Sequence, residues 1–521
     1  MKVGKTRELN EDTFSNAKRL GLDAVVFFRV HPSLDISTIR ELQLHDISNF
    51  TKTARDYAYI KVTQIINNWS ERYDGVFNYK GYDLRWAITK DCHWTLLVEH
   101  SIEQRCNELS SNSTTIFDLD AKPNQLISIF KLLSRFIIPI RLRSKIEGNK
   151  AKNKIAIRVN SEKVLPLMGN LLVELGTKNF VTYQSSLCSN ILDISSLLDK
   201  HGFSNLSFES KNELGWKNNF QFLRLLFSES LHHLNIILSA KNRLKLAVAE
   251  YEALAKSGVT GFLLNAGENE GEGMIAGMVA EKFKIKSFNF MNGTKFNDLM
   301  DQHTNFTHWF VHDEKLRDVL AATSNQKKQN FVVVGHLLED KAHEHKYSKT
   351  LDKYAELLKG KKIIALFSSP LYNQEKVDVA LLLNKFLNEN NDLVVLIRKH
   401  PSEKQDAGYT HERSIVLPDF KEKSTAALFD LMQVAHIAIS FGSTVSLQAS
   451  WFNVPSANYE YLDKSMLYYI DQQKIYHFNK ISQLEKFIND ELNKPKVPVN
   501  AAISQLSVAF KMREYLLGQK N

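Results

Sequence analysis

The chain has 521 residues, more than one ordinary hydrophobic core supports, so its length predicts about two to four domains. Hydrophobic residues make up 43% and charged residues 24%, which excludes a mostly disordered protein. Three cysteines without a CxxC pair indicate a reducing compartment and exclude a disulfide framework. We find neither a signal peptide nor an apolar run long enough to span a membrane, and we therefore expect a cytoplasmic protein.

The net charge of +9 is concentrated in one segment. Lys122–Arg158 holds ten basic residues and a single acid, Glu147, so this segment carries as much net charge as the whole chain. A nucleic-acid-binding protein usually has a broader basic face, and we expect no nucleic-acid partner. The segment is either an amphipathic patch in peripheral contact with an anionic membrane, at the inner face of the plasma membrane, or a core helix followed by a solvated basic loop.

The N-terminal half predicts strands alternating with helices. The expected strands are Asp23–Val30, Lys154–Asn160, Phe180–Ser186, Thr260–Gly267 and Ile285–Thr294. The expected helices are Ile39–Phe50, Ala54–Trp69, Val164–Gly176, Trp216–Lys256 and Glu272–Phe283. The last helix lies between two strands after a glycine turn, which predicts a right-handed parallel βαβ unit.

The C-terminal half predicts a second series of the same kind. Its expected strands are Thr307–Asp313, Phe331–His336, Ile363–Pro370, Leu393–Pro401, Ser414–Asp419, His436–Ser443 and Pro455–Glu460. We therefore predict an α/β fold with two Rossmann-like domains, residues 1–310 and 311–495. A C-terminal helix within 496–521 is expected to cross back over them.

Two polar elements are expected at the carboxyl edge of the second sheet, where ligands of such sheets bind. Lys399, His400 and Pro401 end one strand, and this histidine has the chemistry to donate to a phosphate or protonate a leaving group. Gly442, Ser443 and Thr444 link another strand to a helix, whose N-terminus attracts phosphate. Each element alone is equally compatible with a structural turn or an ordinary helix cap.

Three carboxylates, Glu268, Glu270 and Glu272, follow a strand of the first series at the start of a helix. A carboxylate there is suited to take the proton from an acceptor hydroxyl. Favourable charge on the first helical turn is the alternative, and it explains Glu272 best. A second acidic motif, Asp118-Leu119-Asp120, has the form of a metal-binding DxD, but we expect a loop and no bound metal.

The sequence GSTVSLQASWFNVPSANYE, which ends in Glu460, resembles the donor-site signature of GT-B glycosyltransferases. Together with the KHP element, it is similar to the motifs of bacterial sialyl-, polysialyl- and Kdo-transferases, CDP-glycerol polymerases and capsule-polysaccharide enzymes. The resemblance covers roughly residues 255–465. It implies two Rossmann-like domains with a cleft between them, a donor phosphate held by His400 and the turn hydroxyls, and no metal or other cofactor. The acidic cluster loosely resembles the motif that supplies the base in polysialyltransferases.

The resemblance implies a glycosyltransferase in cell-envelope polysaccharide synthesis. We expect it to move an acidic sugar, a nonulosonic acid or Kdo, from a CMP donor to a hydroxyl of a glycan, lipid-linked or protein acceptor. A UDP-hexose transferase, with Glu460 on the ribose, and a UDP-sugar 2-epimerase-like isomerase would use the same fold. A non-catalytic nucleotide sensor is a further alternative. Inverting and retaining routes both stay open.

Overall fold

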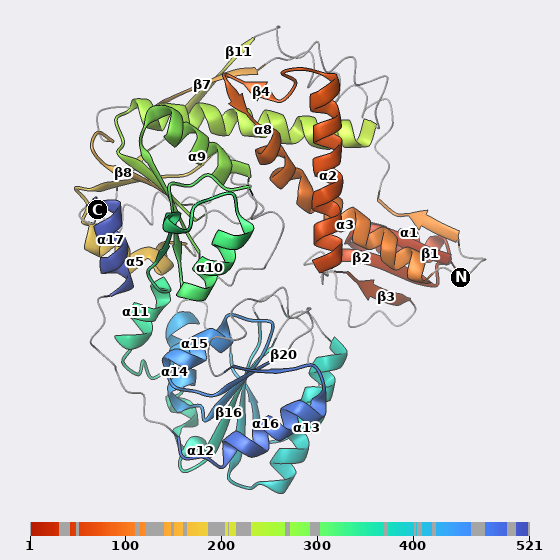
Figure 1. Ribbon diagram of the computed structural model, residues 1–521. Helices are drawn as coiled ribbons and strands as arrows, with labels where there is room; N and C mark the ends of the chain where they lie inside the picture. Colours follow the sequence, from red (N-terminus) through yellow and green to blue (C-terminus); the bar gives the residue numbers. More distant parts are fainter. Residues whose placement is uncertain are drawn as a thin grey trace.

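The computed structural model describes residues 2–30, 42–47, 52–109, 115–120, 140–146, 151–159, 164–185, 204–206, 208–214, 231–265, 271–291, 303–368, 373–400, 403, 409–418, 424–459, 475–496 and 507–518. Three parallel sheets follow one another along the chain (Figure 1). Among the helices in these ranges, none combines the length and apolarity that crossing a membrane requires.

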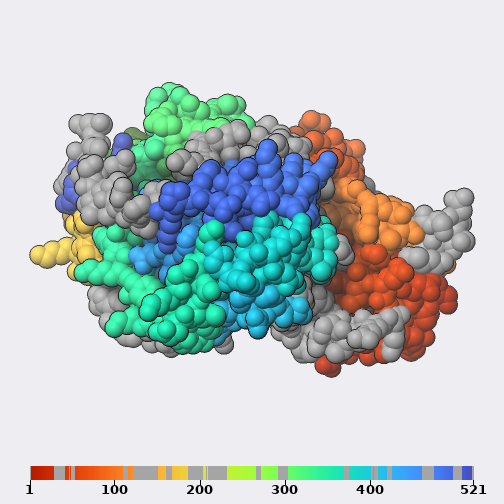
Figure 2. All heavy atoms as spheres, turned by 90° about the horizontal axis from the view of Figure 1, so that it is seen from below, coloured from red at the N-terminus to blue at the C-terminus, as the bar shows by residue number. Residues whose placement is uncertain are grey.

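The N-terminal unit is built on a four-stranded sheet of order β3-β2-β1-β6, in which every pairing is parallel. Its strands and helices are β1 (Lys2–Leu9), α1 (Glu11–Arg19), β2 (Ala24–Val30), β3 (Gln43–Asp46), α2 (Lys52–Arg72), β4 (Asn78–Tyr79), β5 (Tyr82–Asp83), α3 (Arg85–Leu109) and β6 (Thr115–Asp118). Helix α3 contacts β1 and β2 on one side and the central domain's helices on the other, so it joins the two parts. The unit forms a separate lobe at the side of the molecule (Figure 2).

The central domain holds a seven-stranded parallel sheet of order β10-β9-β8-β12-β13-β14-β15. Its elements are β7 (Ile140–Ile146), β8 (Ile155–Arg158), α5 (Val164–Leu175), β9 (Phe180–Tyr183), β10 (Asn205–Leu206), β11 (Phe208–Leu214), α8 (Leu231–Lys256), β12 (Gly261–Leu264), α9 (Gly271–Phe283), β13 (Lys286–Phe290), β14 (His308–Val311), α10 (Glu314–Thr323), a 3-10 turn (Lys328–Asn330), β15 (Phe331–Val333) and α11 (Leu337–His343). Strands β7 and β11 form a separate antiparallel ribbon. The chain reverses its winding between β8 and β12, which marks the switch point of a doubly wound sheet.

The C-terminal domain repeats this architecture with six parallel strands of order β18-β17-β16-β19-β20-β21. Its elements are a 3-10 turn (Asp352–Tyr354), α12 (Ala355–Leu358), β16 (Lys362–Phe367), α13 (Asn373–Glu389), β17 (Leu393–Arg398), β18 (Ser414–Val416), α14 (Ser424–Val434), β19 (Ile437–Phe441), α15 (Val445–Trp451), β20 (Ser456–Tyr459), β21 (Ile475–Phe478) and α16 (Ile481–Leu492). Along β16, Ile364 and Leu366 join one hydrophobic cluster while Ala365 and Phe367 join the cluster on the other face. Helices therefore cover both faces, which explains the continuous apolar strands of the sequence.

The last helix, α17 (Val508–Leu516), crosses back and packs on the central domain beside α5 and α11. Its apolar residues Met512 and Leu516 join the core beneath the seven-stranded sheet. The Asp340 carboxylate of α11 accepts hydrogen bonds from the first two backbone N–H groups of α17, those of Val508 and Ala509, at 2.7 and 2.8 Å. The α/β fold with two Rossmann-like domains and a returning helix is thereby confirmed.

Four expectations need correction. The boundary near residue 310 is too early, because β14 and β15 remain in the central sheet. Residues 43–46 form strand β3 within the segment expected to be a helix, and Asp118 ends strand β6 where a loop was expected. Residues 140–146 of the basic segment form strand β7 rather than a helix or loop, while 121–139 lie outside the described residues.

Candidate functional site

The backbone register brings the predicted donor-site elements to one edge of the C-terminal sheet. Phe367, the last residue of β16, pairs with Arg398 of β17 on one side and with Ser440 of β19 on the other. His400 follows β17 by two residues, and Gly442 directly follows the end of β19. Both elements therefore flank the end of β16, at the point where the winding of the sheet reverses.

A buried ion pair organises the His400 side of this edge. The Glu403 carboxylate pairs with Lys376 of α13 at 2.8 Å, and both side chains are only 2% exposed. The same carboxylate accepts a hydrogen bond from the Ser368 hydroxyl at 2.7 Å and from the His400 backbone N–H at 3.2 Å. Glu403 thus ties the end of β17 to the end of β16 and to α13.

The Gly442 side rests on a buried polar cluster. Gly442 has φ +59°, a left-handed conformation that favours glycine. The side-chain oxygen of Asn458 accepts from the Ser440 hydroxyl at 2.9 Å and from the Ser443 N–H at 3.4 Å. Within the described residues, the buried amide nitrogen of Asn458 has no acceptor.

The turn departs from the helix cap expected of Ser443 and Thr444. The Ser443 hydroxyl oxygen accepts from the Val445 N–H at 3.3 Å, while the Thr444 side chain makes no capping hydrogen bond. Both residues are half-buried. The Thr444 hydroxyl is therefore not used to cap the helix.

The switch point of the central sheet holds Glu272 in a buried network. Its carboxylate pairs with Arg158, at the end of β8, at 2.8 Å and accepts from the Tyr251 hydroxyl at 2.8 Å. Arg158 also donates to the backbone oxygen of Asn265 at 2.6 Å. Burial raises the pKa of Tyr251 well above its usual value, so this tyrosine stays protonated as a donor. Glu272 is engaged through both oxygens, and the geometry argues against it as a general base.

Helix α3 of the N-terminal unit holds the start of α9. The Asp91 carboxylate accepts from the Gly271 N–H at 3.1 Å and pairs with Arg243 of α8 at 2.6 Å. A Cβ at Gly271 would lie 2.2 Å from the backbone oxygen of Ala87, so only glycine permits this approach. Burial raises the pKa of Asp91. The N-terminal unit therefore fixes the helix that carries Glu272 and begins directly after Glu270.

The structure places only some of the predicted site residues. Five of them lie together at one edge of the C-terminal sheet: Lys399, His400, Gly442, Ser443 and Thr444. Glu268, Glu270, Pro401 and Glu460 lie outside the described residues, so their roles stay predictions. The predicted cleft between the two domains also stays a prediction.

Sequence reasoning did not identify Ser368, Lys376 or Glu403. Glu403 lies three residues beyond His400, and that spacing was the available signal. Its partner Lys376 is 27 residues away and had no motif of its own. In the ranges covered by the structure, no cluster of three His, Cys, Asp or Glu residues is arranged to hold a metal ion.

No family model and no curated protein sequence matches the chain. Among solved structures, it is similar to the UDP-GlcNAc 2-epimerase of Methanocaldococcus jannaschii, with TM-score 0.47 and 11% identity over 70% of this chain and 99% of that one. The Neisseria meningitidis UDP-GlcNAc 2-epimerase bound to UDP-GlcNAc gives TM-score 0.47 and 11% identity over 70% of this chain and 100% of that one. A wall teichoic acid polymerase gives TM-score 0.39 and 12% identity over 77% of this chain and 97% of that one.

Proposed function

We propose that the chain is a nucleotide-sugar-dependent glycosyltransferase whose donor binds at the carboxyl edge of the C-terminal sheet. The observation that carries the proposal is the register that places His400 and the Gly442–Thr444 turn on opposite sides of the end of β16. A small-residue turn admits a phosphate close to the backbone, and a histidine can donate to it.

In this mechanism an acceptor hydroxyl displaces the nucleotide phosphate from the sugar. His400, Ser443 and Thr444 hold the departing phosphate and offset its growing negative charge. Lys399 adds a cation at the same strand end. Because Glu272 is engaged with Arg158, we assign the general base to Glu268 or Glu270. The KHP resemblance leads us to propose CMP as the nucleotide and an acidic sugar as the transferred group.

The test is a product assay on the purified full-length protein. CMP-N-acetylneuraminate, CMP-Kdo and UDP-N-acetylglucosamine are each incubated with a set of oligosaccharide acceptors, and both the nucleotide and the sugar product are identified. We expect CMP release with transfer to an acceptor, abolished in His400→Ala. His411→Ala, a histidine just before β18 at the opposite edge of the sheet, is the matched control. Acceptor-independent conversion of UDP-N-acetylglucosamine to its 2-epimer would replace the proposal with the isomerase alternative.

A further inference from the structure

The N-terminal unit contains a cavity at the carboxyl edge of its four-stranded sheet. Strand β1 lies between β2 and β6 in this sheet, so the winding reverses between β1 and β6. The cavity of about 940 Å³ opens at this switch point and is lined by the ends of both strands, by α1, and by helices α2, α3 and α8. This position and volume match those of small-molecule sites in doubly wound folds.

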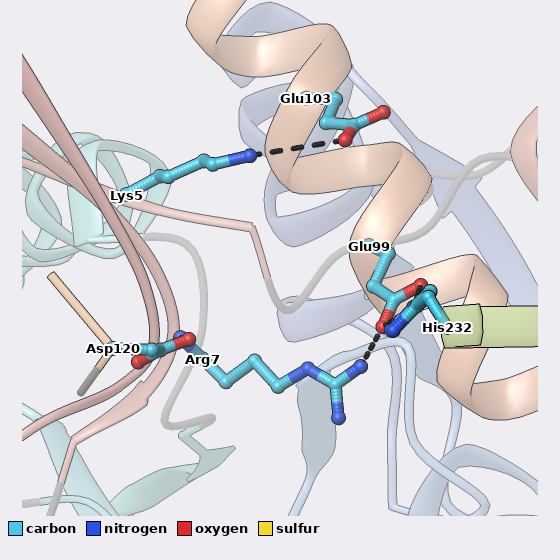
Figure 3. A network of polar contacts seen from close by, with 6 residues as sticks. All are labelled: Lys5, Arg7, Glu99, Glu103, Asp120 and His232. Atoms are coloured by element: carbon cyan, nitrogen blue, oxygen red, sulfur yellow. Dashed lines mark hydrogen bonds and ion pairs between the residues drawn. The ribbon is translucent and has the colours of Figure 1, made fainter. Parts of the chain in front are cut away.

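The cavity wall is acidic. Its carboxylates are Glu8, Asp12, Glu99, Glu103, Asp118 and Asp120. Its permanent cations are Lys5, Arg7 and Lys61, which leaves three negative charges in excess. Figure 3 shows how part of this charge is paired: Arg7 and His232 both meet Glu99, and Lys5 lies 3.8 Å from Glu103. Burial lowers the pKa of His100 and of His232, so neither adds positive charge at neutral pH.

The first helix of this unit is not built to bind phosphate. A nucleotide at such a switch point normally rests on a glycine-rich turn and free N–H groups at the helix N-terminus. Here the turn from β1 to α1 contains no glycine, and Asn10 accepts from the Thr13 N–H at 2.9 Å. Glu11 and Asp12 add negative charge in the first turn. The wall therefore repels phosphate where a dinucleotide site would attract it.

The remaining surface fits a polyhydroxylated ligand. Tyr57, which is 48% exposed, stacks on His100 with ring centroids 4.1 Å apart, and both line the cavity. Aromatic faces of this kind pack against the C–H face of a sugar ring. Carboxylate oxygens accept from hydroxyls, while the amides of Asn16 and Asn235 can both donate and accept.

We propose that this cavity is a saccharide-binding site, separate from the donor site, for the neutral or amino-bearing sugar units of a glycan. The proposal stands without the transferase activity, because binding is measured with no donor present. A glycan held in this lobe would be carried by α3, the helix whose Asp91 also anchors the start of α9. The site thus gives the N-terminal unit a function that the two Rossmann-like domains do not supply.

The test is binding of the full-length protein to an array of immobilised neutral, amino-bearing and sialylated oligosaccharides, with CMP and inorganic phosphate measured separately in solution. We expect retention of neutral or amino-bearing glycans, weakened at least tenfold in Tyr57→Ala and in Asp12→Asn. Ile60→Ala is the matched control, since it lies on the same helix, is 46% exposed and does not line the cavity. Circular dichroism verifies that each variant is folded.

Three results would overturn the proposal. The first is no retention of any neutral or amino-bearing glycan by the folded wild type. The second is glycan binding that Tyr57→Ala and Asp12→Asn leave unchanged, because the glycan would then bind elsewhere. The third is loss of CMP or phosphate binding in these two variants, since that would make the cavity an anion site. The first two outcomes leave the His400 site untouched, so they are distinguishable from failure of the proposed donor site. The third outcome would also move CMP binding away from His400, which the His400→Ala variant tests separately.

Discussion

Replacing Lys376 with methionine tests whether the buried pair with Glu403 organises the donor-site edge. The substitution leaves the Glu403 carboxylate 2% exposed and without its cation. Removing one partner of a buried pair costs about 3–5 kcal/mol of unfolding free energy. The Ser368 hydroxyl still donates at 2.7 Å, so we expect the lower end, about 3 kcal/mol. The double variant Lys376→Met/Glu403→Gln removes both charges and should lie within about 1 kcal/mol of wild type.

The assay is urea denaturation of the full chain, which measures the free energy of unfolding. Hydrogen exchange then tests whether the lost stability is located in β16, β17 and α13. Lys385→Met is the matched control, because Lys385 lies on the same helix and pairs with Glu485 at the same 2.8 Å, but is 55% exposed. A surface pair of this kind contributes about 0–1 kcal/mol. The reasoning is refuted if Lys376→Met lowers the free energy of unfolding no more than Lys385→Met does. It is also refuted if the double variant loses as much as Lys376→Met and Glu403→Gln lose together when made singly.

Three further predictions concern the central domain. Gly271→Ala should cost about 1–3 kcal/mol in urea denaturation, since its Cβ meets the Ala87 oxygen at 2.2 Å, whereas Gly169→Ala, with its nearest contact at 3.5 Å, should cost less. Glu272→Gln should destabilise by about 3 kcal/mol, because it removes the charged carboxylate that pairs with the buried Arg158. Glu268→Gln or Glu270→Gln should instead lower turnover about 100-fold with nucleotide binding retained. Burial lowers the pKa of His303 from 6.5 to about 4, so the free energy of unfolding should fall as the pH drops from 6.5 towards 4. This pH dependence should be shallower in His303→Phe, and an equal pH dependence in the two proteins would contradict the prediction.

The buried strands were predictable because their composition matches their environment. In strand β17, residues 393–397 are all apolar, since both faces of the sheet are covered. Strand β3, Gln43–Asp46, was missed because it is a short edge strand that contains mostly polar residues. Strand β6 escaped prediction for a different reason: it pairs with β1, more than a hundred residues earlier in the chain, and no local pattern encodes that pairing.

The domain boundary illustrates a related limit. Strand β15 has the same apolar character as the strands of the C-terminal sheet, and only its pairing with β14 places it in the central sheet. The position of the candidate site at one edge of the sheet was predictable, because His400 and Gly442 each follow the end of a buried strand. Of its supporting pair, Glu403 had one signal, its spacing from His400, whereas Lys376 depends on tertiary packing and had none.

The central claim, a nucleotide donor site at the edge that holds His400, is tested most directly by thermal stabilisation. The full-length protein is titrated with CMP, CDP, UDP and GDP, in parallel with His400→Ala, Ser443→Ala and the control His411→Ala. We expect CMP to raise the melting temperature of the wild type and the control, and to lose this effect in the other two variants. Stabilisation by UDP alone would redirect the proposal to a hexose transferase or epimerase. A melting temperature that no nucleotide changes, or a CMP effect that survives His400→Ala and Ser443→Ala, would contradict the donor site.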